Sequence, residues 1–94
     1  MRNWGLNLAW EIKYSLEVQK VMQKMDRGVA KEVYDYLGEI RGLSDPRSRG
    51  KGLTFNLSGL WRYRVRDMRI LCEIQDNELI VLVVHIGKRE TVYK

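Results

Sequence analysis

The fold of this chain is decided by residues 60–75, which read LWRYRVRDMRILCEIQ. Apolar and polar side chains alternate through residues 60–66 and again through residues 68–75, and this period of two predicts two strands that each bury one face. The first strand divides its side chains between arginines and core-forming residues: Arg62, Arg64 and Arg66 against Trp61, Tyr63 and Val65. We therefore expect a sheet with a basic face, which Arg69 extends onto the second strand, and an apolar face.

A third strand is expected at residues 78–86, which read ELIVLVVHI and are rich in Val, Ile and Leu. The preceding Asp76 and Asn77 are turn formers, so we expect a two-residue hairpin turn in which Gln75 pairs with Glu78. This register puts His85 on the apolar face of the sheet, which favours a satisfied or supporting histidine over a catalytic one.

The N-terminal half predicts a strand and two helices. Residues 8–14 alternate as a strand does. Apolar residues at three- and four-residue spacing predict one helix over residues 15–25, capped by Ser15, and a second from Asp26 to Gly42. The expected fold class is α+β, in which a helical hairpin packs on one face of a roughly four-stranded antiparallel sheet. We expect a single domain over residues 1–94.

Charge is concentrated in the middle of the chain. Residues 41–69 have a net charge of +6 and the remaining residues −1, which together give the +5 of the whole chain. The middle block holds these cations: Arg41, Arg47, Arg49, Lys51, Arg62, Arg64, Arg66 and Arg69. Such a block indicates a binding surface for a polyanion, although a solvated basic face is the simpler alternative.

Several classes of protein are disfavoured. No apolar run approaches the length of a membrane span, no leader sequence is visible, and the lone Cys72 cannot form an internal disulfide, so we expect a cytoplasmic protein. The single histidine and scattered carboxylates predict neither a metal site nor a Ser-His-Asp site. No glycine pattern for a nucleotide is present, so we expect no cofactor.

Three segments resemble a known family: residues 57–65 (LSGLWRYRV), residues 68–70 (MRI) and residues 85–93 (HIGKRETVY). Together they resemble the RelE branch of the RelE/ParE toxin superfamily, and the resemblance extends over nearly the whole chain. It implies a RelE-like fold and an endoribonuclease that cleaves mRNA in the ribosomal A site. It also implies a RelB-like antitoxin as partner, in a toxin–antitoxin hetero-oligomer.

The resemblance places the catalytic set on Arg64, Arg69, Arg89 and Tyr93, with Arg62 beside them. We expect further cations to bind RNA phosphates: Lys51, Arg62, Arg66 and Lys88. Three positions depart from the family pattern. Relatives can have a lysine assigned as base where this chain has Arg64, often a basic residue at Thr54, and often a histidine at Lys88. The identity of the general base is therefore open.

The implied reaction needs no metal, because the RNA's own 2′-hydroxyl attacks the adjacent phosphorus. Arginines suit the stabilisation of the developing charge, but they are poor bases. Tyr93 is the preferred candidate for moving protons, with Lys51 or Lys88 as substitutes. Two alternatives remain: a ParE-like toxin that inhibits gyrase without nuclease activity, and a non-catalytic RNA-binding or ribosome-binding module.

Overall fold

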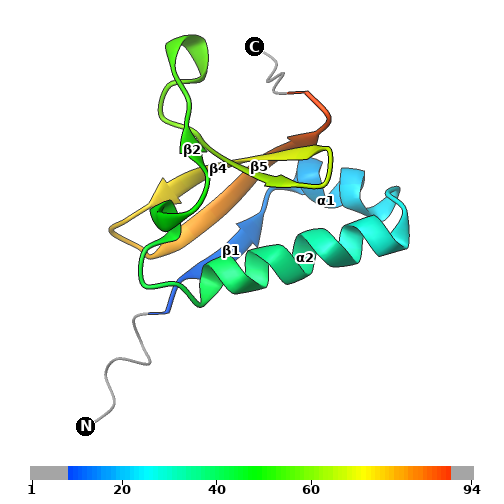
Figure 1. Cartoon of the computed structure of the whole chain (residues 1–94), viewed down its shortest axis with the longest axis horizontal. Helices are drawn as coiled ribbons and strands as arrows, with labels where there is room; N and C mark the ends of the chain where they lie inside the picture. Colours follow the sequence, from blue (N-terminus) through cyan, green and yellow to red (C-terminus); the bar gives the residue numbers. More distant parts are fainter. Residues whose placement is uncertain (1–8, 90–94) are drawn as a thin grey trace, which may run out of the picture.

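The computed structural model describes residues 9–89, which form five strands and two α-helices around one sheet. The elements in chain order are β1 (Glu11–Tyr14), α1 (Leu16–Gln23), α2 (Arg27–Arg41), β2 (Lys51–Gly52), β3 (Trp61–Val65), β4 (Met68–Gln75) and β5 (Ile80–Gly87). Two short 3-10 turns, η2 (Pro46–Ser48) and η3 (Phe55–Leu57), lie in the loops on either side of β2. Figure 1 shows the strands crossing above α2, with the η3 loop standing away from the sheet.

The sheet has the order β1-β5-β4-β3-β2, and its layout confirms the α+β class. Two details differ from the expectation. The sheet has five strands instead of about four, and β1 runs parallel to β5 although the other pairs are antiparallel. Alternation identifies a strand but not its direction, and the two residues of β2 are too few to show a period.

Both helices begin where the sequence predicts. The side chain of Ser15 accepts a hydrogen bond from the amide of Val18, and that of Asp26 accepts one from the amide of Val29, each at 3.1 Å. These caps satisfy amides that have no partner within the helix. The second helix ends at Gly42, as expected.

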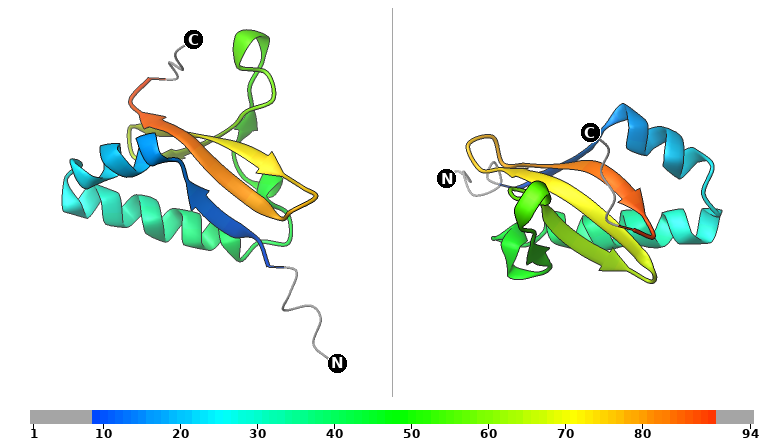
Figure 2. Two further views of the ribbon diagram at one scale, coloured as in Figure 1. Left: turned by 180° about the vertical axis from the view of Figure 1, so that it is seen from behind. Right: turned by 90° about the horizontal axis from the view of Figure 1, so that it is seen from above.

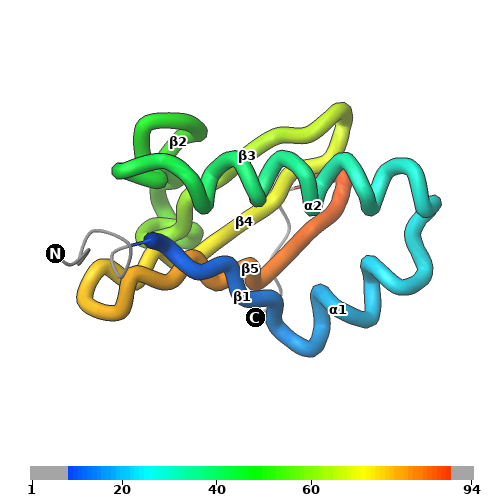
Figure 3. The backbone as a smooth tube through the Cα atoms, turned by 90° about the horizontal axis from the view of Figure 1, so that it is seen from below, coloured from blue at the N-terminus to red at the C-terminus, as the bar shows by residue number. Residues whose placement is uncertain are grey.

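The helices cover one face of the sheet, as the view from below in Figure 3 shows for α2. Their buried side chains meet those of three strands in one core, whose fully buried members include Val33, Leu37, Ile40, Tyr63, Ile70, Cys72, Val81 and Val83. Burial raises the pKa of the Cys72 thiol, so this cysteine acts as a small apolar residue. No helix within residues 9–89 is long and apolar enough to cross a membrane.

The turn between β4 and β5 is longer than expected. Gln75 pairs with Ile80 instead of Glu78, so residues 76–79 form a four-residue turn. The amide of Leu79 donates to the carbonyl of Asp76. The prediction of a two-residue turn was therefore wrong, because Asp76 and Asn77 mark the start of the turn but do not fix its length.

The loop before β2 is fastened to the apolar face of the sheet. The hydroxyl of Tyr63 donates to the carbonyl of Pro46 at 2.6 Å, and the indole of Trp61 donates to the carbonyl of Arg49 at 2.7 Å. Gly50 completes this contact with a φ of 86°. A Cβ on Gly50 would lie 2.5 Å from the carbonyl oxygen of Arg62, so only glycine fits.

We predict that Gly50→Ala lowers the free energy of unfolding by about 3 kcal/mol, because strain at a positive φ adds to a collision with strand backbone. Gly59→Ala is the matched control, since Gly59 has a φ of 97° but nothing within 4 Å of its Cβ position. It should cost only about 1 kcal/mol. Chemical denaturation measures both values, and equal losses would contradict the close approach at Gly50.

A second prediction concerns the ion pair that joins this loop to the β4–β5 turn. Arg47 donates to both carboxylate oxygens of Asp76, at 2.8 and 2.9 Å, and these hydrogen bonds lower the pKa of Asp76. A lowered pKa in the folded state means that the pair stabilises the fold above the ordinary aspartate range, and that this contribution disappears as pH falls through the folded pKa. In an NMR titration, Arg47→Gln should return the pKa of Asp76 toward its ordinary value. An unchanged Asp76 titration in that variant would show that the pair is absent in solution.

Candidate nucleic-acid interface

The face of the sheet opposite the helices carries two rows of side chains that run across the strands. The strand register aligns Lys51, Arg62, Leu71 and His85 in the first row, and Arg64, Arg69 and Gly87 in the second. Neighbouring strands in a sheet lie about 4.8 Å apart, so each row places its members side by side. We name the surface formed by Lys51, Arg62, Arg64 and Arg69 the basic face.

The second row brings two arginines directly opposite each other. Arg64 on β3 pairs in register with Arg69 on β4, an arrangement in which like charges destabilise a sheet. Arg64 is exposed, and within residues 9–89 no carboxylate forms an ion pair with it. One nitrogen of the Arg69 guanidinium donates to the carbonyl of Lys88. This geometry favours a bound anion between the two side chains.

Arg66 does not continue the row of Arg62 and Arg64, contrary to expectation. The strand ends at Val65, and Arg66 occupies the following turn with a φ of 57°. Its guanidinium turns toward α2 and donates to both carboxylate oxygens of Glu32, at 2.5 and 2.7 Å. The alternation of a strand stops being informative where the chain turns. The phosphate-binding role expected of Arg66 remains a prediction that would require it to leave Glu32.

Other arginines of the middle block are also directed elsewhere. Arg47 pairs with Asp76, and Arg49 with Glu39 at 2.9 Å. Arg41 donates to the backbone carbonyl of Trp10. The basic surface is therefore smaller than the charge of residues 41–69 predicts, and the surface that could bind a polyanion is the basic face.

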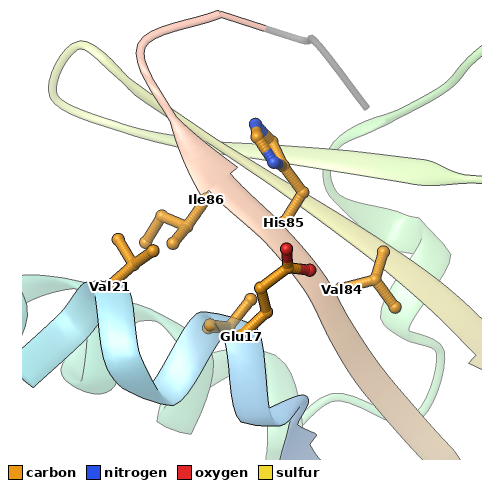
Figure 4. Close-up of a pocket in the computed structure, with 6 residues that line it drawn as sticks. Glu17, Val21, Val84, His85 and Ile86 are labelled. Carbon is orange, nitrogen blue, oxygen red and sulfur yellow. The ribbon is translucent and has the colours of Figure 1, made fainter. Parts of the chain in front are cut away.

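His85 lies on the opposite face from the one predicted, because β5 contains a bulge. Cys72 pairs with Val83 and Leu71 with His85, so Val84 is an extra residue that reverses the alternation. Figure 4 shows the side chains of His85 and Ile86 leaving β5 in different directions. His85 therefore joins the row of Arg62, while Ile86 enters the core.

His85 contacts the backbone that follows β5. Its Nε2 lies 3.1 Å from the carbonyl oxygen of Arg89. Because a carbonyl only accepts, Nε2 must be the protonated nitrogen in this contact. Together with the bond from Arg69 to the carbonyl of Lys88, this contact holds the residues after β5 beside the basic face.

The remaining predicted site residues lie at the end of β5 or outside the described residues. Arg89 is exposed, and Lys88 lies 3.6 Å from the carboxylate of Asp67. Tyr93 lies outside residues 9–89. The site as described therefore contains the cations expected on β2, β3 and β4, with Lys88 and Arg89 at its border.

Three hollows adjoin the basic face, and one of them, of about 200 Å³, is lined by Arg64, Arg66, Asp67 and Arg69. A second, of about 380 Å³, is lined by Lys51, Arg62 and Arg64 together with Tyr36 and Gly50. Tyr36 lines this hollow from α2 and is not among the residues predicted for the site. The third, of about 160 Å³, lies between α1 and β5 and is lined by Glu17, Val18, Val21, Val84, His85 and Ile86, which Figure 4 draws as sticks. Within residues 9–89, no group of three or more histidine, cysteine or acidic side chains could hold a metal ion.

Both helices lie on the other side of the sheet from these cations in the views of Figure 2. Leu71 is nevertheless fully buried although it belongs to this face. It lies in register between Arg62 and His85, so these two long side chains flank an apolar centre. The basic face is therefore an ordered surface with cations at fixed positions.

Comparison with known proteins identifies the family. The profile of the family described as ParE toxin of type II toxin-antitoxin system, parDE, matches residues 12–93. By sequence, no curated protein matches the chain.

Solved structures of toxins share the fold. The toxin-antitoxin complex RelBE2 from Mycobacterium tuberculosis aligns with a TM-score of 0.76 at 20% identity, covering 86% of this chain and 99% of that chain. A mutant of Escherichia coli RelE in complex with an antitoxin RelBc peptide gives 0.72 at 21% identity, covering 88% and 86%. The archaeal RelE-RelB complex from Pyrococcus horikoshii gives 0.67 at 15% identity, covering 88% and 99%. With a RelE-like fold and a family profile that matches most of its length, the chain belongs to the ParE toxin family of type II toxin-antitoxin systems, within the RelE/ParE superfamily.

Proposed function

We propose that this toxin is a ribosome-dependent endoribonuclease that cleaves mRNA in the A site without a metal ion. The observation that carries the proposal is the direct opposition of Arg64 and Arg69 on an open sheet face, with Lys51 and Arg62 in the next row. Two guanidiniums directly opposite each other in a sheet repel, and an anion bound beside both would offset the repulsion. RNA supplies such a ligand through its phosphates.

The proposed reaction proceeds by attack of a 2′-hydroxyl on the adjacent phosphorus and departure of the 5′-oxygen of the next nucleotide. Negative charge grows on the phosphoryl oxygens in the transition state, and preorganised cations stabilise it. Arg64 and Arg69 are placed to take this part, and Lys51 and Arg62 to bind the flanking phosphates. A rigid sheet holds these side chains better than a loop would.

Tyr93 is the proton acceptor in this proposal, although it lies outside the described residues. Lys51 and Lys88 are the substitutes. Lys88 would first have to leave its ion pair with Asp67, whereas Lys51 has no ion pair with any residue in the described range 9–89. Lys51 is therefore the better second choice.

The backbone of Arg89 is held beside the basic face by hydrogen bonds from other residues of the site. Hydrogen bonds from Arg69 to the carbonyl of Lys88 and from His85 to the carbonyl of Arg89 orient the backbone of these two residues. We assign His85 a positioning role. The bulge that places it on this face supports the role, since a histidine on the core face could not reach this backbone.

The partner of the toxin is a RelB-like antitoxin, in a hetero-oligomer that silences the toxin in the cytoplasm. The fold relatives include RelE toxins in complex with RelB antitoxins, which supports this assignment. The net charge of +5 is also suited to an acidic partner segment.

A gyrase-inhibiting toxin is the second candidate, because the matching family carries the ParE name. The experiment that separates the two adds the purified toxin to translating ribosomes, maps mRNA ends by primer extension, and in parallel measures DNA supercoiling by gyrase. Cuts within A-site codons and unimpaired gyrase are expected. Intact mRNA with arrested gyrase would replace the proposal with the second candidate.

We predict that Arg64→Ala slows A-site cleavage by about 100- to 1,000-fold, because one donor to the developing charge is lost. Stability should stay equal or rise slightly, since a like-charge opposition is relieved. Arg49→Ala is the matched control, with the same change in charge at a guanidinium that pairs with Glu39, and it should alter the rate by no more than about twofold. If the Arg64→Ala variant cleaved mRNA as fast as the Arg49→Ala control, the catalytic role of Arg64 would be contradicted.

Arg89→Ala and Tyr93→Phe should each abolish growth inhibition on expression, while capture of the antitoxin in a pull-down remains at the wild-type level. The reason is that each change removes a proposed functional group, the guanidinium of Arg89 or the hydroxyl of Tyr93. Full toxicity in both variants would overturn the assignment of the C-terminal segment to the site.

A further inference from the structure

Three non-glycine residues within residues 9–89 have a left-handed backbone conformation. They are Phe55, Arg66 and Leu79, with φ angles of 56°, 57° and 54°. This conformation is unfavourable for residues with a Cβ, and a large side chain that adopts it needs a reason. Such outliers are found where structure or function requires them.

Two of the three have a reason inside the chain. Arg66 gains its two hydrogen bonds to Glu32 on α2. Leu79 packs against the core, and its carbonyl accepts a hydrogen bond from the amide of Glu11 at 2.9 Å. In both cases the conformation is accompanied by a contact within the chain.

Phe55 has no such reason within the described chain. Its side chain is 92% exposed, the highest exposure among the large apolar residues that stand out at the surface. The backbone around it is nevertheless ordered by hydrogen bonds, from the amide of Ser58 to the carbonyl of Phe55 at 3.0 Å and from the amide of Leu53 to the carbonyl of Leu60 at 3.0 Å. The fold thus holds an exposed aromatic ring at the tip of a closed loop that Figure 1 shows standing away from the sheet.

The loop begins and ends at the basic face. It connects β2 to β3, and the residues at its two ends include Lys51 and Arg62, which are directly opposite each other in the sheet. The loop itself, residues 53–60, carries no charged side chain. Phosphates bound at Lys51 and Arg62 would therefore bring neighbouring nucleotides to an uncharged aromatic tip.

We propose that Phe55 is a stacking platform for one nucleobase of the RNA that lies on the basic face. A base matches this surface better than a protein partner, because Phe55 is the one exposed apolar side chain of the loop. The polar neighbours Thr54 and Asn56 are exposed on either side of it, and Leu53, Leu57 and Leu60 are half-buried. Stacking of a base on an aromatic side chain requires no particular sequence and stabilises single-stranded nucleic acid binding substantially. The choice of RNA as the ligand rests on the proposed function.

The test compares Phe55→Gly with Phe55→Trp in the full-length toxin. Glycine adopts a positive φ without strain, so Phe55→Gly should keep the melting temperature or raise it by about 4 °C. The same variant should bind RNA about tenfold more weakly, whereas Phe55→Trp should bind as tightly as the wild type or more tightly. Leu16→Ala is the control for the loss of an exposed apolar side chain, since Leu16 is 75% exposed at the start of α1.

Two probes distinguish the source of the base: a short fluorescein-labelled oligoribonucleotide, and vacant ribosomes without mRNA. Weaker binding of Phe55→Gly to the oligonucleotide identifies an mRNA base, and weaker binding to vacant ribosomes alone identifies a ribosomal RNA base. Wild-type affinity for both probes would overturn the proposal. So would a loss of antitoxin capture alone, which would make the loop a protein contact.

The outcome is separable from that of the proposed function. Wild-type toxin that leaves mRNA intact on ribosomes contradicts the nuclease, whatever Phe55 does. Wild-type toxin that cuts in the A site, with Phe55→Gly binding and cutting equally well, contradicts only the stacking platform.

Discussion

The placement of the site depends on one extra residue in β5. Val81 and Val83 point into the core, and without the bulge at Val84 the next inward side chain would be His85. The bulge puts Ile86 into the core instead, which satisfies the hydrophobic effect at the end of the strand. As a consequence, an imidazole reaches the polar face of the sheet, and the backbone of the following residues passes within its hydrogen-bonding distance.

The two faces of the sheet have different roles, since one stabilises the fold and the other carries the proposed site. Its apolar face binds the helices and fastens the loop before β2 through Tyr63 and Trp61, and this packing stabilises the fold. Its other face carries features that lower stability, including the opposed Arg64 and Arg69. Local choices that disagree with stability tend to mark function, and here they gather on one side of the molecule and on the loop that leaves it.

Local signals made much of this structure predictable. The caps at Ser15 and Asp26 correctly predicted where the two helices begin. Alternation predicted both ends of β4 and the face of the sheet on which Arg62 and Arg64 lie. The parallel partner of β1 and the bulge at Val84 were not predictable, because both depend on contacts between segments far apart in the chain. The length of the turn after Gln75 was missed for the same reason, since register is settled by pairing.

Charge along the sequence indicated a polyanion surface but could not locate it. Arg47, Arg49 and Arg66 belong to the basic middle block, yet each pairs with a carboxylate from outside that block, on Asp76, Glu39 or Glu32. These pairs are exposed and contribute little to stability individually. Their effect is on the distribution of charge, because they pair three cations of the middle block with carboxylates away from the basic face. Folding thus gathers part of a diffuse excess of positive charge, Lys51, Arg62, Arg64 and Arg69, on one face of the sheet.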